Sequence, residues 1–243
     1  MRIALHAVGE TGTRAGLILL AERSLTALGI YGGGSLASDR RALRITELAG
    51  FDLLVTDDPD PAALAAIAVE DGLSCVTTGA VPAAMAERFA TQGRTLLTGT
   101  GLRGLAATLA AHEAAGMEGP VRTSVAWTIP GKSLRRGLAV GFPDPVGARW
   151  GRSVPGGVEV PVGGSWAAAS VTVTGRFAGK TVERLVGVAD QRDHLEGIAL
   201  AAGAIAVASG AFAPGGHTPA DAPTAYLGAA LGVGLGVAVH QEP

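Results

Sequence analysis

Small and polar residues stand close together near the start of the chain, between an apolar run at 3–8 and a helix-like segment. They are Gly9, Thr11, Gly12, Thr13 and Arg14. Glycines at a strand-to-helix turn let the backbone approach a pyrophosphate, which then accepts bonds from the N–H groups of the helix N-terminus. The spacing G-x-x-G-x-x-A is a variant of the dinucleotide-binding pattern. These residues are therefore predicted to bind a cofactor, although a glycine turn without a ligand has the same composition.

The end of the second expected strand, 25–31, is where nucleotide folds choose between NAD and NADP. No acidic residue stands at that strand end, and Ser35 and Arg40 follow it. Serine and arginine suit the 2′-phosphate of NADP through charge-assisted hydrogen bonds. The sequence therefore favours NADP over NAD. Asp39 could still hold a ribose, and Arg40 could belong to the solvated face of a helix over 40–48.

Two later strand ends also carry small polar residues. Thr77, Thr78 and Gly79 close one apolar run, and Thr100 follows another. Ligands of open parallel sheets bind at the carboxyl ends of the strands. We therefore predict that the first three residues bind the cofactor and that Thr100 contacts the substrate. Turns that bind no ligand use the same residue types.

Four candidates for substrate chemistry lie between residues 128 and 150. Lys132 is a candidate proton donor for the reduction of a carbonyl or imine carbon. Arg135 could bind a substrate carboxylate, and Asp144 and Arg149 could form a substrate wall. Each also has an ordinary interpretation as a solvated side chain or a turn residue. The five histidines are scattered and no cluster has metal-ligand spacing, so we predict no metal site.

The elements that must position these residues differ between the two halves of the chain. Strand-like and helix-like segments alternate up to residue 115, with short connections, which predicts a doubly wound parallel sheet. The expected strands are 25–31, 51–56, 73–79 and 94–98, and the expected helices are 61–70, 82–91 and 102–115.

From residue 121 the alternation stops, and consecutive strand-like runs separated by glycine and proline turns predict a mainly antiparallel sheet. The runs are 122–128, 138–142, 158–162, 168–174 and 182–189, followed by expected helices at 191–209 and 222–239. The predicted organisation is an α/β chain with a Rossmann-type dinucleotide-binding domain over 1–118 and an α+β substrate or oligomerisation domain over 119–221. The segment 222–243 is predicted to pack on the first domain or at a dimer interface.

Two runs resemble dihydrodipicolinate reductases: FDLLVTDDPDP from Phe51 and GLSCVTTG from Gly72. In that family a strand D-V-V-I-D-F-T precedes a proline turn, a helix and a strand ending G-T-T-G. The loop at 9–15 is similar to that family's nucleotide loop, and 97–105 resembles a turn found there and in saccharopine-dehydrogenase-like proteins. The resemblance covers roughly the first half and implies an NAD(P)-binding oxidoreductase. The paired-histidine motif of dihydrodipicolinate reductases is absent, so it does not imply their activity.

The composition limits the classes of partner that the chain is expected to bind. The formal net charge of −2 favours neither a nucleic acid nor an anionic membrane. Cys75 is the single cysteine and is expected to be a buried, inert thiol, which suits a reducing cytoplasm. No signal peptide is visible, and the apolar segment 226–239 is too short and too rich in glycine for a membrane span. Its apolarity suits a homodimer or higher homo-oligomer.

The combined prediction is an NAD(P)-dependent oxidoreductase. It would transfer hydride between a nicotinamide cofactor and a small carbonyl or imine substrate of amino-acid-like character. One alternative is a non-catalytic nucleotide-binding or scaffold protein that retains the fold. Another is a nucleotide-sugar or other phosphoryl-ligand enzyme that uses the same glycine loop.

Overall fold

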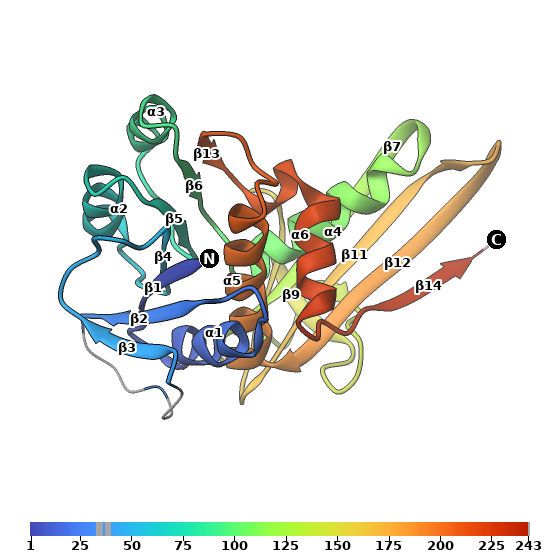
Figure 1. The fold of residues 1–243 in the computed structure, drawn as a ribbon. Helices are drawn as coiled ribbons and strands as arrows, with labels where there is room; N and C mark the ends of the chain where they lie inside the picture. Colours follow the sequence, from blue (N-terminus) through green and yellow to red (C-terminus); the bar gives the residue numbers. More distant parts are fainter. Residues whose placement is uncertain (33–35, 37–39, 243) are drawn as a thin grey trace.

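The computed structural model describes residues 1–32, 36 and 40–242. In this part of the chain two seven-stranded sheets lie on either side of a central helix, α5 (Arg192–Ala208). Figure 1 shows sheet A on the left and sheet B on the right, with α5 between them. The predicted α/β organisation of two different sheets is confirmed.

Sheet A is parallel throughout, with strand order β13-β6-β5-β4-β1-β2-β3. Successive residues of its central strands point to opposite faces, and consecutive residues such as Ile3, Ala4 and Leu5 are apolar and buried. Both faces of the sheet are therefore apolar. Helices α1 and α5 cover one face, and α2 and α3 cover the other. The strands are β1 (Arg2–His6), β2 (Ala27–Tyr31), β3 (Ala42–Ile45), β4 (Leu53–Thr56), β5 (Ser74–Thr77), β6 (Thr95–Leu97) and β13 (Gly215–His217). The helices are α1 (Glu10–Ala21), α2 (Ala62–Glu70), α3 (Ala84–Thr91) and α4 (Leu102–Ala115).

Two edges of sheet A differ from the sequence prediction. The segment 40–48, expected as a helix, contains the edge strand β3, which pairs with β2. The segment 214–219, between the expected helices at 191–209 and 222–239, contains β13, which pairs with β6. In both places the backbone bonds to an open strand edge, and such edges leave N–H and C=O groups that need partners. Neither segment is long or apolar enough to reveal this pairing by its own pattern.

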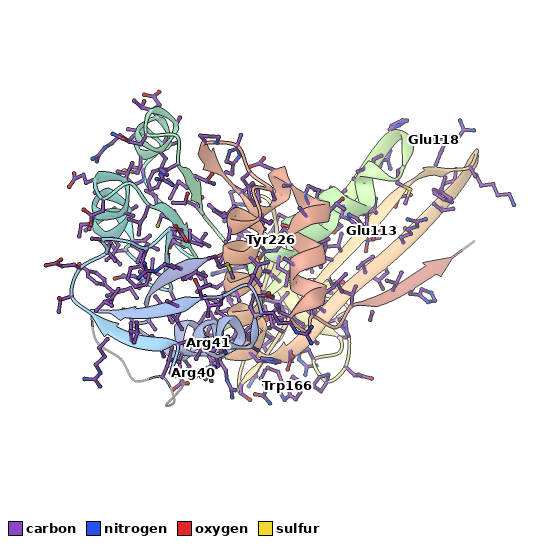
Figure 2. The ribbon with its side chains drawn as sticks, viewed as in Figure 1. Arg40, Arg41, Glu113, Glu118, Trp166 and Tyr226 are labelled. Carbon is purple, nitrogen blue, oxygen red and sulfur yellow. The ribbon has the colours of Figure 1, made fainter. Side chains whose placement is uncertain are left out.

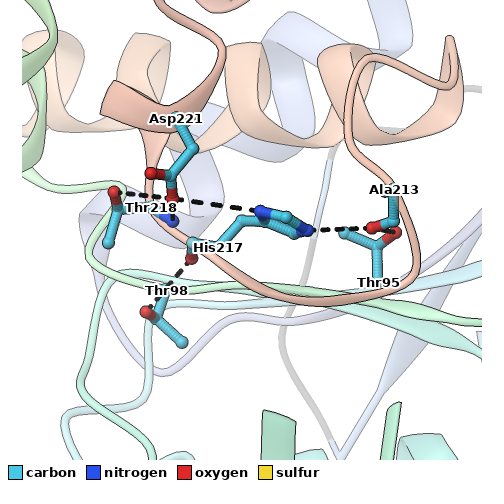
Figure 3. Close-up of polar contacts among 6 residues, drawn as sticks. All are labelled: Thr95, Thr98, Ala213, His217, Thr218 and Asp221. Atoms are coloured by element: carbon cyan, nitrogen blue, oxygen red, sulfur yellow. Dashed lines mark hydrogen bonds and ion pairs between the residues drawn. The ribbon is translucent and has the colours of Figure 1, made fainter. Parts of the chain in front are cut away.

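Side-chain hydrogen bonds hold the chain on both sides of β13 (Figure 3). The Thr95 hydroxyl on β6 donates to the carbonyl of Ala213 at 3.0 Å. A capping box between Thr218 and Asp221 begins the short 3-10 helix η1 (Pro219–Asp221). These bonds fix the segment 218–220 beside the carboxyl end of β6.

Sheet B has strand order β14-β12-β11-β7-β10-β9-β8, and its neighbours are antiparallel except β7 and β10. This confirms the predicted mainly antiparallel sheet. Two of its strands, β9 and β14, are not among the predicted ones. The strands are β7 (Glu118–Pro130), β8 (Leu138–Val140), β9 (Arg149–Val154), β10 (Gly157–Val162), β11 (Trp166–Phe177), β12 (Lys180–Gln191) and β14 (Ala238–Glu242).

The last expected helix, 222–239, is shorter than predicted. Helix α6 spans Pro223–Gly232, and β14 then pairs with the edge of β12. Gly234 has a φ of +107°, which a helix cannot accommodate, and the chain turns into the strand there. Tyr226 lies between α6 and α5 (Figure 2), and its buried hydroxyl donates to the carbonyl of Ala199 at 2.8 Å. The apolar residues of the C-terminal segment therefore include some that pack inside this chain, in helix α6.

Helix α1, which begins at the glycine loop, packs directly on α5. A Cβ at Gly197 would lie 2.7 Å from the Cβ of Arg14 and 3.1 Å from the nitrogen of Ala15. Such a Cβ would force the helices apart, so the close contact depends on glycine at this position. As a result, the first turn of α5 reaches the edge of sheet A where the glycine loop lies. Helix α5 also packs on sheet B, and the predicted domain limits stay predictions.

Two further expectations concern single features. Cys75 is fully buried in sheet A, and burial raises the pKa of its thiol to about 12. The thiol is therefore held in its unreactive protonated form. Within the described residues, no helix is both long and apolar enough to cross a membrane.

Candidate functional site

The glycine loop connects β1 to α1, as the sequence predicts, and a carboxylate from another strand fills it. Asp57 follows β4 directly. Its Oδ1 accepts a hydrogen bond from the N–H of Val8 at 2.7 Å. Its Oδ2 accepts from the N–H groups of Gly9 at 3.1 Å and Gly12 at 2.8 Å. The side chain of Asp57 thus occupies three amides of the loop that was predicted to hold a pyrophosphate.

The two glycines make room for this carboxylate. A Cβ at Gly12 would lie 2.7 Å from Asp57 Oδ1 and 2.8 Å from the Cβ of Ala7, and one at Gly9 would lie 3.2 Å from Asp57 Oδ2. The close approach predicted for these glycines is therefore made by Asp57. A pyrophosphate does not fit on the three amides while the carboxylate holds them, because both groups are anionic acceptors of the same N–H bonds.

The other predicted residues of the loop point in different directions. The Thr13 hydroxyl donates to the carbonyl of Gly9 at 3.0 Å and closes the first turn of α1. Arg14 is exposed, and its Cβ faces Gly197 on α5. The Thr11 hydroxyl donates to Oε2 of Glu196 at 3.4 Å. Thr11 therefore links the glycine loop to the start of α5.

Two residues, Ser35 and Arg40, are predicted to select NADP, and the structure describes one of them. Ser35 lies outside the described residues. Arg40 is exposed in the turn before β3 (Figure 2). Its neighbour Arg41 donates to the carbonyls of Leu20 and Glu22 at the end of α1. Of the two arginines, Arg40 is therefore the exposed one.

A cavity of about 570 Å³ lies between the carboxyl ends of β5 and β6, strand β7 of sheet B and the first turn of α5. Thr78 and Gly79 line it, whereas Thr77 is buried behind them and accepts a bond from the N–H of Gly79 at 3.1 Å. Thr98 lines the cavity as well, and its hydroxyl donates to the carbonyl of His217 at 3.4 Å (Figure 3). The cavity is thus at the sheet edge where the sequence predicts ligand binding.

Two charged residues from α5 line this cavity and were not predicted. Arg192 Nη1 lies 3.6 Å from Oε1 of Glu196, and 13% and 27% of the two side chains is exposed. Burial raises the pKa of the Glu196 carboxyl, although the positive charge of Arg192 acts in the opposite direction. A carboxyl group can donate or accept a proton, and a guanidinium can bind a carboxylate.

The other polar groups of the cavity are largely engaged with the protein. Arg103 donates to the carbonyl of Pro155 at 2.9 Å, and its guanidinium lies over the ring of Trp127 at 5.2 Å. Thr128 accepts a bond from the N–H of Ala168 at 2.9 Å. Arg192 Nη2 donates to the carbonyl of Trp166 at 3.2 Å, and Arg192 and Glu196 together form the ion pair that lines the cavity.

The predicted substrate residues do not line this cavity. Lys132, Arg135 and Asp144 are exposed on loops of the second half. Arg149 is half-buried and donates to the carbonyl of Ala148 at 2.8 Å. Thr100 is fully buried, and its hydroxyl has no partner among the described residues, although its glycine neighbours line the cavity.

One signal in the sequence could have indicated Arg192 and Glu196. They lie four residues apart in the first turns of the helix predicted at 191–209, so they share a helix face. What the sequence could not show is that this face meets the edge of sheet A. Among the described residues, no group of three or more His, Cys, Asp or Glu side chains is placed to hold a metal ion.

The fold can be compared with known proteins. No protein-family model matches the chain, and no curated protein matches its sequence. The homospermidine synthase of Legionella pneumophila in complex with NAD matches with a TM-score of 0.59 and 8% identity, over 99% of this chain and 91% of that one. An engineered D-amino acid dehydrogenase bound to NADP+ matches with a TM-score of 0.55 and 12% identity, over 93% and 95%.

A third structure is the dipicolinate-bound dihydrodipicolinate reductase of Paenisporosarcina sp. TG-14. It matches with a TM-score of 0.54 and 10% identity, over 90% of this chain and 97% of that one. Identities this low establish the fold alone. The chain therefore shares the fold of these three proteins, one of which is a dihydrodipicolinate reductase, the family that its sequence resembles.

Proposed function

We propose that the chain is an NAD(P)-dependent oxidoreductase acting on a small carbonyl or imine substrate of amino-acid-like character. The observation that carries the proposal is the placement of Glu196 and Arg192. Both line a cavity at the carboxyl edge of sheet A, and Glu196 is bonded to Thr11 of the glycine loop. Acid–base and carboxylate-binding groups beside a dinucleotide-type loop suit this chemistry.

In this proposal each charged residue has a separate task. Glu196 exchanges a proton with the reacting nitrogen or oxygen, because its raised pKa keeps more of the carboxyl protonated than an exposed glutamate would. Arg192 binds the carboxylate of the substrate. The nicotinamide group supplies the hydride chemistry. The pyrophosphate requires that Asp57 leave the amides it holds.

The experiment is a turnover assay with NADH and with NADPH against a panel of 2-oxo acids with ammonia, and in reverse with amino acids. Glu196→Gln is expected to lower turnover about 100-fold or more, the usual loss when a positioned general acid is removed. Asp193→Asn is the matched control, because this exposed carboxylate on the same helix turn does not line the cavity. Equal turnover of wild type and Glu196→Gln would contradict the role of Glu196.

The sequence predictions enter the same assay. Lys132→Ala tests whether this exposed lysine is the proton donor. If it is, the substitution lowers turnover without lowering the affinity for the cofactor. Turnover with NADPH rather than NADH would support the proposed preference for NADP, for which Arg40 is the described candidate. An unchanged ratio of NADPH to NADH affinity in Arg40→Ala would contradict that role. A homodimer or higher homo-oligomer and a cytoplasmic location remain part of the proposal.

The second candidate is a non-catalytic protein that binds a small anionic molecule in the same cavity. The specific observation that favours it is the carboxylate of Asp57 on the loop amides. In that case Arg192 serves binding alone, and no dinucleotide is needed. Neither NADH nor NADPH would then raise the melting temperature of wild type at any concentration, whereas a ligand of the native state must raise it.

A further inference from the structure

We propose that Asp57 is an internal competitor for the phosphate groups of a dinucleotide. Its carboxylate holds the glycine loop in a closed state, and a dinucleotide binds there by displacing it. The proposal rests on the proposed function for the identity of the ligand. It does not depend on which substrate is reduced or on whether the chain turns over.

The contact is built into the register of sheet A. Strands β1 and β4 are parallel neighbours, and His6 is opposite Thr56. The residues that follow, Ala7 and Asp57, therefore leave the sheet side by side at its carboxyl edge. The Thr56 hydroxyl then accepts a bond from the N–H of Asp58 at 3.1 Å, which fixes the turn after β4. Asp57 reaches the loop from a defined position.

Both oxygens of this carboxylate are used by the loop. One accepts from Val8 at 2.7 Å, and the other from Gly9 at 3.1 Å and Gly12 at 2.8 Å. Backbone N–H groups at the positive end of a helix are the groups that bind phosphates. A carboxylate there has the charge sign and the acceptor geometry of one phosphate group. It therefore satisfies the loop in the absence of a ligand.

The same turn contains two further amides. The N–H groups of Glu10 and Thr11 have no acceptor among the described residues. When Asp57 leaves, the five consecutive amides of residues 8–12 have no acceptor among the described residues. When Asp57 stays, its negative charge repels any anion that approaches the remaining two. The Asp57 side chain thus lowers the affinity of the loop for phosphate groups in two ways, by its negative charge and by occupying the amides.

The first test uses inorganic pyrophosphate as the probe and the melting temperature as the readout. At the same concentration, pyrophosphate is expected to raise the melting temperature of Asp57→Ala more than that of wild type, because in wild type it must first displace the carboxylate. Asp58→Asn is the matched control, since Asp58 is the next residue and makes no bond to the loop. If Asp57→Ala does not fold, Asp57→Asn keeps the shape of the side chain and removes its charge.

The second test titrates NADH and NADPH by nicotinamide fluorescence. Asp57→Ala or Asp57→Asn is expected to bind at least one of them about tenfold more tightly than wild type, which corresponds to about 1.4 kcal/mol. Equal affinity of wild type and both variants, with no pyrophosphate effect, would overturn the proposal. Tighter binding without turnover would refute the oxidoreductase and leave the role of Asp57 intact. If wild type binds the cofactor tightly and turns over, and neither property changes in the Asp57 variants, the oxidoreductase stands and the role of Asp57 is refuted.

Discussion

The glycine loop and the cavity beside α5 lie at the same edge of sheet A, and they differ in how their polar groups are satisfied. In the loop, three amides bind the carboxylate of Asp57. In the cavity, Arg192 and Glu196 face about 570 Å³ of open space and contact each other at 3.6 Å. The chain itself closes the first region, whereas the second is open to a ligand. Backbone amides that suit a phosphate ligand can therefore be bound by a side chain of the same protein.

Helix α5 joins these two regions, and Gly197 is where it meets α1. Gly197→Ala is expected to lower the free energy of unfolding by about 1–3 kcal/mol, because the added methyl lies 2.7 Å from the Cβ of Arg14. Urea denaturation measures the change. Gly228→Ala is the matched control: no atom lies within 4 Å of its added methyl, and the helical glycine is replaced by a better helix former. That variant is expected to gain up to about 1 kcal/mol. Equal effects at the two sites would contradict the close helix contact.

The opposite side of α5 is supported by α6. Tyr226→Phe removes the hydrogen bond from the buried hydroxyl to the carbonyl of Ala199 and keeps the ring in place. The expected loss is about 1 kcal/mol of unfolding free energy, the usual net value of one hydrogen bond. Thermal and urea unfolding measure it. A variant as stable as wild type would show that packing of the ring, rather than the hydrogen bond, holds α6 on α5.

The smallest expected effect concerns the pH dependence of stability. Burial raises the pKa of Glu196 above its ordinary value of 4.5, so the folded chain holds this proton more tightly than the unfolded chain. Ionisation of Glu196 therefore reduces stability as the pH rises from about 4.5 through the raised pKa. Glu196→Gln has no such loss. The stability of the variant relative to wild type is expected to be lowest below pH 4.5 and to increase above it.

Urea unfolding at a series of pH values measures this difference, with Glu118→Gln, a change of an exposed carboxylate outside the cavity, as the control. A relative stability of Glu196→Gln that decreases as the pH rises would contradict the account. That result would mean that the attraction between Arg192 and ionised Glu196 outweighs the cost of burying the charge.

The local parts of this architecture could be predicted from the sequence. The loop at Gly9 and Gly12, the alternation of strands and helices and the helix α4 (Leu102–Ala115) follow from residue periodicity and turn residues, which act over short distances. The edge strands β3 and β13 could not, because their pairing depends on neighbours distant in sequence. The contact of Asp57 with Gly12 spans 45 residues and depends on strand order.

The same limit applies to the candidate site. Thr78 and Gly79 line the cavity, and their place at a strand end was visible in the sequence. Glu196 enters the site because α5 returns from the second half of the chain to the edge of sheet A, and its contact with Thr11 spans 185 residues. Lys132 has the residue type and the loop position of a proton donor, but neither property shows whether its side chain reaches a cavity.

In the proposed function the loop controls dinucleotide binding and the cavity controls the chemistry, and one titration separates the two roles. NADPH and NADH are titrated against wild type, Asp57→Asn and Glu196→Gln, in which the glutamine keeps an acceptor for Thr11. The account predicts that Asp57→Asn binds at least one cofactor about tenfold more tightly and that Glu196→Gln binds like wild type. Affinity that is unchanged by Asp57→Asn, or altered equally by both substitutions, would contradict it.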